Sequence, residues 1–107
     1  MESGAVVPSL WRLEVANALQ MSVKRKRIDA AYRDISLDAL RALEIDIDSK
    51  TDQHAWSATL RLAERFDLTA YDAAYLELAQ RRSLPLASLD RDLREAGAAL
   101  NIALLGS

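Results

Sequence analysis

The chain contains no cysteine and only one histidine, His54, among its 107 residues. Disulfide bonds, thiolate metal sites, a cysteine nucleophile and a histidine-rich zinc site are therefore excluded. The sequence also lacks an apolar run of about 18 residues or more and lacks the pattern of a signal peptide. We therefore expect a soluble cytoplasmic protein without a membrane-spanning segment.

Glycine and proline are also scarce, with three and two residues, and the sequence contains neither an internal repeat nor a flexible linker. Half of the residues are hydrophobic and 28% are charged, which is ordinary for a globular protein. The length predicts a single domain over residues 1–107. A formal net charge of −2 gives no global attraction to nucleic acid, so any such binding must use local patches.

The spacing of apolar residues predicts short strands that alternate with helices. Strands are expected at residues 4–8, 43–48, 84–89 and 101–105. Helices are expected at residues 10–21, 28–43, 52–66, 70–82 and 90–100, the first capped by Ser9 and the second with a candidate break at Ile35 and Ser36. This order predicts an α/β fold, in which helices cover both faces of a short parallel sheet.

The second strand carries acidic residues at alternate positions. In the sequence Leu43-Glu44-Ile45-Asp46-Ile47-Asp48, apolar and acidic residues alternate. A period of two places one set of side chains inward and the other outward. We therefore expect Glu44, Asp46 and Asp48 to lie on a solvated face, and we do not expect them to form a ligand cluster.

Thr69 and Asp72 have the spacing of a capped helix start, in which the hydroxyl caps the first turn and the acid complements the helix dipole. A site is the alternative, because Asp72 shares a helical face with Tyr75, Leu76 and Ala79. A carboxylate at the edge of an apolar core requires a cation, a metal ion or several donors. Both interpretations stay open from this segment alone.

Two further acids are placed like Asp72. Glu14 interrupts an apolar helical face after the first strand, and it could equally be a glutamate whose head reaches water. Asp90 directly follows the strand expected at residues 84–89. Sites in parallel sheets lie beyond the carboxyl ends of the strands, so Glu14, Asp72 and Asp90 can reach one crevice. Crowded carboxylates need a compensating cation, and oxygen-only ligands suit Mg²⁺ or Mn²⁺.

Basic residues supply a second candidate feature. Lys24, Arg25, Lys26 and Arg27 form a continuous run between two helices. Such a run is typical of a solvated turn, although it could also meet phosphates. Scattered basic residues near the acidic segments have the same two interpretations; they are Arg12, Arg81, Arg82, Arg91 and Arg94.

Three segments together resemble one known family. Residues 7–19, VPSLWRLEVANAL, resemble the second acidic motif of the PIN-domain family in its VapC-type toxin branch. Residues 68–76, LTAYDAAYL, resemble the third motif, and residues 86–93, LASLDRDL, the fourth. Their order and spacing agree with the family, so the similarity extends over nearly the whole chain.

The resemblance implies a three-layer α/β/α fold and a metal-dependent endoribonuclease that cleaves structured RNA such as transfer RNA. It implies Mg²⁺ or Mn²⁺ as cofactor, a cognate antitoxin whose tail occupies the acidic groove, and a homodimer. The implied metal-site carboxylates are Glu14, Asp72 and Asp90, with Asp92 as an additional ligand. The implied supporting residues are Ser88, Asn17 and Thr69, and the candidate RNA contacts are Arg12, Arg81 and Arg91.

The sequence departs from the family at one point. The family opens with a strand that ends in V-x-D-x-S and supplies the first metal-site aspartate, and this pattern is not found here. We therefore expect a partial domain whose central strand is missing or supplied by another chain, which would leave two half-sheets with open edges. Activity should be weak or absent in this chain alone. The alternatives are a non-catalytic module that binds an antitoxin or another copy, and a structural domain whose acids are capping residues.

Overall fold

The computed structural model describes residues 5–105, so Gly4, expected at the start of the first strand, lies outside the described residues. The chain divides into two compact units, residues 1–47 and residues 48–107. The prediction of a single domain stays a prediction. No helix within residues 5–105 is long and apolar enough to cross a membrane.

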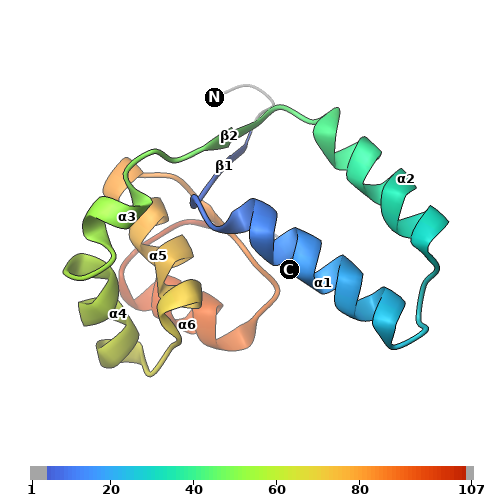
Figure 1. Cartoon of the computed structure of the whole chain (residues 1–107). Coiled ribbons are helices and arrows are strands. Elements are labelled where there is room, and N and C mark those ends of the chain that lie inside the picture. The colour runs from blue at the N-terminus through green and yellow to red at the C-terminus, as the bar shows by residue number, and fades with distance from the viewer. Residues whose placement is uncertain (1–4, 106–107) are drawn as a thin grey trace. The chain divides into compact units, whose positions relative to one another are not determined.

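The first unit is a helical hairpin between two paired strands (Figure 1). Its elements are β1 (Ala5–Val7), α1 (Trp11–Lys24), α2 (Ala30–Arg41) and β2 (Ile45–Ile47). Strand β1 pairs in parallel with β2, with Ala5 opposite Ile45. Pro8 follows β1 directly and is fully buried, so the first strand ends where it was predicted to end.

The helix ends of this unit correct two predictions. Leu10, and not Ser9, occupies the N-cap position of α1, and no side chain caps that helix. Helix α2 is continuous through Ile35 and Ser36, so the candidate break is wrong. Asp29 explains the start of α2, because its Oδ1 accepts a hydrogen bond of 2.8 Å from the backbone N–H of Tyr32.

The second unit packs helices around α5. Its elements are α3 (Thr51–His54), α4 (Ala58–Phe66), α5 (Ala70–Arg82), β3 (Leu86–Ala87), α6 (Arg91–Ala99) and β4 (Leu104–Leu105). Helix α5 contacts α4, α6 and β3 (Figure 1). Its inner face carries Ala73, Leu76 and Ala79, all buried, and these form a core with apolar side chains of α4, β3 and α6.

The helix expected over residues 52–66 is two helices. The chain leaves the helical conformation at Ser57, whose φ of −127° and ψ of −95° separate α3 from α4. The backbone N–H of Ser57 instead closes a turn on the carbonyl oxygen of His54 at 3.2 Å. Continuous apolar periodicity across residues 52–66 concealed this turn.

Glycine permits the close packing of α6 on the second strand pair. Strands β3 and β4 pair in parallel, with Leu86 opposite Leu104. A Cβ atom at Gly97 would lie 3.0 Å from a methyl carbon of Leu104 and 3.1 Å from one of Leu86. Gly97 therefore lets the helix approach these two side chains more closely than other residues would allow.

The mixed α/β class with short parallel strands is confirmed. Within residues 5–105 the strands form two separate pairs, β1 with β2 and β3 with β4. The missing central strand stays a prediction. Each strand is only two or three residues long, which is shorter than predicted. Among the flanking apolar residues that suggested longer strands, Ile102 packs against the core, whereas Leu43 and Leu89 are exposed.

Candidate active site

Asp72 lies in the first turn of α5, where the helix start is defined by a side-chain cap. The hydroxyl oxygen of Thr69 accepts a hydrogen bond of 3.1 Å from the backbone N–H of Asp72, which confirms the predicted cap. The Asp72 residue is half-buried and is followed by the buried Ala73 and Ala74. An acidic residue at this position interacts favourably with the positive end of the helix dipole.

Asp90 is held just beyond the carboxyl end of β3. Its Oδ2 accepts a hydrogen bond of 2.9 Å from the N–H of Leu93 and so caps α6. Its own N–H donates to the hydroxyl oxygen of Ser88 at 3.0 Å. Arg94 stabilises this loop by donating to the carbonyl oxygens of Ser88 at 3.0 Å and Leu105 at 2.8 Å. These hydrogen bonds fix Asp90 in place, although the residue is exposed to solvent.

The remaining candidates of the second unit lie on the surface of α6. Asp92 is exposed in the first turn of that helix. Arg91 precedes it and pairs with Glu95 at 3.2 Å, with 88% of the Arg91 side chain exposed to solvent. Arg91 is thus accessible to a phosphate, whereas its pair with Glu95 contributes little to stability.

Glu14, Arg12 and Asn17 belong to the first unit and lie on α1. Glu14 is half-buried in the first turn of the helix, and Arg12 and Asn17 are exposed. Asn17 follows Glu14 by three residues, so the two side chains lie on the same side of the helix. Strand β1 ends at Val7, four residues before α1 begins, which places this helix start after the carboxyl end of β1.

A buried ion-pair network in the second unit was not anticipated. The guanidinium group of Arg81 donates through Nη1 and Nη2 to the two carboxylate oxygens of Asp48, at 3.2 and 2.7 Å. Through Nε and Nη2 it also donates to Glu77, at 2.6 and 3.0 Å. The hydroxyl of Thr51 donates to Asp48 at 2.9 Å. The side chains of Asp48 and Glu77 are each only 4% exposed.

This network corrects the prediction that Asp48 lies on a solvated face with Glu44 and Asp46. Glu44 and Asp46 are exposed, but Asp48 is buried. Its hydrogen bonds with Arg81 hold the pKa of the Asp48 carboxyl below its usual value, against the opposing effect of burial. Strand β2 ends at Ile47, so the period of two no longer governs where the next side chain points.

The network also affects the candidate RNA contact at Arg81. Four hydrogen bonds from its guanidinium group already go to Asp48 and Glu77. The two carboxylates raise the pKa of Arg81, and they neutralise its positive charge within the fold. The spacing of Glu77 and Arg81 on one helix could have indicated half of this network. The third member, Asp48, lies 33 residues from Arg81 along the chain and left no local signal.

The donor chemistry of the candidate site fits a hard divalent cation. Glu14, Asp72 and Asp90 offer carboxylate oxygens, and each side chain is half-buried or exposed and so can be reached. Oxygen-rich ligand sets of this kind suit Mg²⁺ and Mn²⁺. Among the residues described in either unit, no three histidine or acidic side chains gather into a group that could hold a metal ion.

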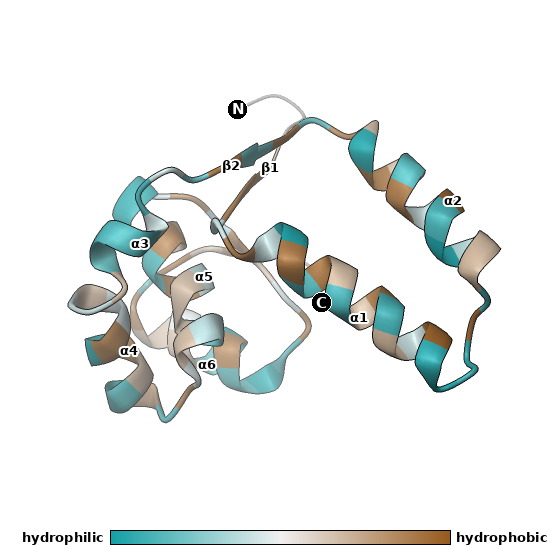
Figure 2. Cartoon of the chain, in the orientation of Figure 1, coloured by the Kyte–Doolittle hydropathy of each residue, from teal (hydrophilic) through white to brown (hydrophobic). Residues whose placement is uncertain are grey.

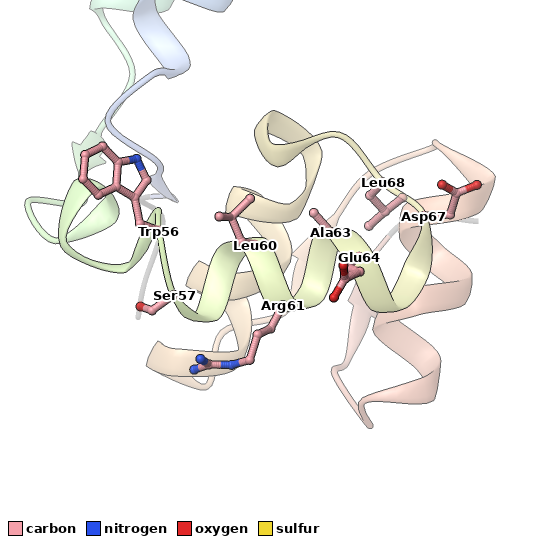
Figure 3. Close-up of a pocket in the computed structure, with 8 residues that line it drawn as sticks. All are labelled: Trp56, Ser57, Leu60, Arg61, Ala63, Glu64, Asp67 and Leu68. Atoms are coloured by element: carbon pink, nitrogen blue, oxygen red, sulfur yellow. The ribbon is translucent and has the colours of Figure 1, made fainter.

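Each unit also has a hollow on its surface. In the first unit, a hollow of about 470 Å³ is lined by α1, α2 and β2, including Trp11, Leu37 and Leu40. In the second unit, a hollow of about 560 Å³ runs along α4 from Trp56 to Leu68 (Figure 3). The Trp56 side chain at one end of it is almost fully exposed.

The fold and the acids together define an α/β protein in which Glu14 and Asp90 lie at the starts of helices that follow short parallel strands. Asp72 lies in the first turn of α5, which follows α4. A comparison with family profiles matches the PIN domain over residues 1–99, and the chain belongs to the PIN domain family. PIN domains are generally nucleases that act on RNA and use divalent metal ions. The comparison with curated proteins found no match.

Proposed function

We propose that the chain is a metal-dependent endoribonuclease of the VapC toxin–antitoxin type. The observation that carries the proposal is the placement of Asp72 and Asp90. Each is fixed at a helix start in the same unit, one by the Thr69 cap and the other by the Ser88 loop. Membership of the PIN domain family supports nuclease chemistry for acids in these positions.

Glu14, Asp72 and Asp90 would hold Mg²⁺ or Mn²⁺, with Asp92 as an additional ligand. When bound, such an ion supplies an activated water and neutralises charge on the phosphoryl oxygens. Thr69 and Ser88 act as positioning residues, because their hydroxyls accept the backbone N–H groups of Asp72 and Asp90. Asn17 lies near Glu14 on α1 and would orient its carboxylate or the substrate. Structured RNA such as transfer RNA is the proposed substrate.

Activity should depend on a carboxylate that this sequence does not contain. The family's first motif, V-x-D-x-S, is not found among the 107 residues. Loss of one ligand lowers the negative charge of the site and hence its affinity for a divalent cation. We expect weak cleavage by the chain alone and stronger cleavage when a segment bearing that motif is supplied in trans.

The test is cleavage of transfer RNA by the purified chain with Mg²⁺ or Mn²⁺, compared with Asp72→Asn and with Glu95→Gln as a matched surface control. The proposal predicts metal-stimulated cleavage that Asp72→Asn abolishes and Glu95→Gln leaves unchanged, since Glu95 forms only an exposed pair. Adding a V-x-D-x-S peptide should increase the rate. Cleavage that survives Asp72→Asn would contradict the proposal.

Two protein partners complete the proposal. A cognate antitoxin would inhibit the enzyme by placing its tail over the acids. A second copy of the chain would pack on the α4 hollow, whose lining includes both Arg61 and Glu64 (Figure 3). In an antiparallel pair, Arg61 of one copy would meet Glu64 of the other, and Trp56 would meet Leu68. Exposed tryptophans of this kind are frequent anchors of protein interfaces.

The self-association can be tested by charge exchange. Arg61→Glu places like charges opposite each other across the two-fold axis, so we expect a shift toward monomer in analytical ultracentrifugation. Combining it with Glu64→Arg restores the complementarity and should restore the dimer. A sedimentation coefficient that is the same in all three proteins would exclude α4 as the interface.

The first unit favours a second candidate function, a PIN-derived module that binds a partner without catalysis. Neither α1 nor α2 has a buried residue, and Leu13, Tyr32 and Ile35 are more than half exposed. Apolar surface of this extent is typical of interaction sites. If Asp72→Asn leaves antitoxin affinity unchanged and the unmodified chain shows no metal-stimulated cleavage, the binding module is the correct function.

A further inference from the structure

The turn between α1 and α2 concentrates positive charge in an acidic protein. Lys24, Arg25, Lys26 and Arg27 hold four of the 14 lysines and arginines, whereas the whole chain has a net charge of −2. All four residues are exposed. Figure 2 shows this end of α1 and the following turn as strongly hydrophilic.

The backbone of this turn closes without help from the four side chains. The N–H of Lys26 donates to the carbonyl oxygen of Val23 at 3.0 Å, and the N–H of Arg27 donates to that of Ser22 at 2.9 Å. These two bonds form a Schellman motif, which satisfies the last carbonyl groups of the helix. The fold therefore requires the backbone conformation of the turn but not its charges.

Lys26 stands in a position that ordinarily favours glycine. It is the residue after the helix cap, and its φ of 60° lies in the left-handed region. A side chain there is strained, and glycine is the usual residue in this place. Three further non-glycine residues in the described part of the chain share this left-handed conformation, so it does not by itself indicate a function. The helix dipole accounts for cations at Lys24 and Arg25, whereas Lys26 and Arg27 lie beyond the helix end.

Nearby acidic residues do not neutralise the four basic side chains of the turn. Within residues 5–105, no ion pair or side-chain hydrogen bond involves any of the four basic side chains. Asp29, the first acid after the run, caps α2 through the N–H of Tyr32. Asp34 pairs with Arg33 at 2.9 Å. The turn thus presents four unneutralised cations on a hydrogen-bonded backbone.

We infer that this basic turn, residues 24–27, is a docking site for the phosphate backbone of RNA. Consecutive exposed cations suit closely spaced phosphates, and neutralising each phosphate releases counterions and makes binding depend on salt. Contacts to phosphates position a nucleic acid without reading its bases. The choice of RNA as the polyanion rests on the proposed function, whereas the turn's binding of phosphates does not require catalysis.

The experiment measures the affinity of the full chain for a fluorescein-labelled single-stranded RNA by anisotropy, in EDTA so that no cleavage occurs. The turn variant replaces Lys24, Arg25, Lys26 and Arg27 with glutamine. The matched control removes four scattered charges, through Arg33→Gln, Arg41→Gln, Lys50→Gln and Arg65→Gln. Both variants have the same net charge.

The turn variant should bind RNA more weakly than the control. The slope of log affinity against log salt concentration should decrease by about 0.7 for each phosphate that the variant no longer neutralises. An equal decrease in affinity for the two variants would show a general charge effect and would overturn the inference. Wild-type affinity in the turn variant, or binding of anionic lipid vesicles in place of RNA, would overturn it as well.

Lys26→Gly separates binding from folding. Glycine removes one charge and relieves the left-handed strain, so RNA affinity should decrease while the melting temperature increases by about 4 °C. A purely structural lysine would not move the two measurements in opposite directions. If this turn binds RNA but Asp72→Asn does not affect cleavage, the result contradicts the proposed active site and supports the docking site.

Discussion

At the scale of single residues, Arg81 is the most consequential side chain in the second unit. It connects Asp48, at the beginning of that unit, with Glu77 on α5. Removing one partner from a buried ion pair leaves an uncompensated charge in a poorly solvated environment. Removal of Arg81 would leave two such charges, since both carboxylates are almost fully buried.

We therefore predict that Arg81→Ala destabilises the protein by about 3–5 kcal/mol. The matched control is Arg41→Ala, which removes an ion pair with Asp38 whose side chains are both more than 70% exposed. That pair should contribute little, because solvent screens it. Urea denaturation measures both free energies of unfolding, and an equal decrease in the two variants would show that the buried network is not stabilising.

Asp48 makes the stability depend on pH in acid. Because the pKa of Asp48 is lowered in the folded state, the unfolded chain binds protons more readily. The contribution of Asp48 is therefore fully present above its unfolded pKa of about 3.9 and is lost as the pH falls through the lower folded value. Asp48→Asn should have a lower melting temperature at neutral pH and a smaller decrease in acid. Parallel melting curves for the two proteins between neutral pH and acid would contradict this.

At the scale of elements, helix caps were the most predictable features. Thr69 and Asp90 were correctly placed at helix starts, because capping depends on residues only a few positions apart. The predicted cap at Ser9 was wrong, and the helix expected over residues 52–66 is two helices. Local sequence does not reveal how tertiary packing bends the chain. The burial of Asp48 was not predicted either, because its partner Arg81 lies on a helix that is distant along the chain.

Packing of α6 on β3 and β4 gives a prediction at this scale. Gly97→Val would introduce methyl groups where even a Cβ comes within 3.1 Å of Leu86 and 3.0 Å of Leu104. Overpacking of this kind destabilises proteins by about 1–3 kcal/mol. Ala98→Val, at the neighbouring exposed position of α6, tests the intrinsic effect of a β-branched residue. If both variants lose the same free energy in chemical denaturation, close packing at Gly97 is not significant.

At the scale of the whole molecule, the PIN domain and its α/β class were evident from the order of three motifs. The described strands form two parallel pairs. The buried ion-pair network and the closed backbone of the basic turn could not be predicted in this way. Both depend on which groups meet in space, and periodicity describes only one element at a time.

The proposed function includes the claim that Glu14, Asp72 and Asp90 hold a divalent ion, and this claim rests on membership of the PIN domain family. The most direct test is Mn²⁺ binding by electron paramagnetic resonance, with the unmodified chain, Glu14→Gln, Asp72→Asn, Asp90→Asn and the surface control Glu95→Gln. We predict a bound Mn²⁺ ion whose affinity is weakened by each of the three site substitutions and unchanged in Glu95→Gln. Mn²⁺ affinity that is the same in all five proteins would contradict the claim.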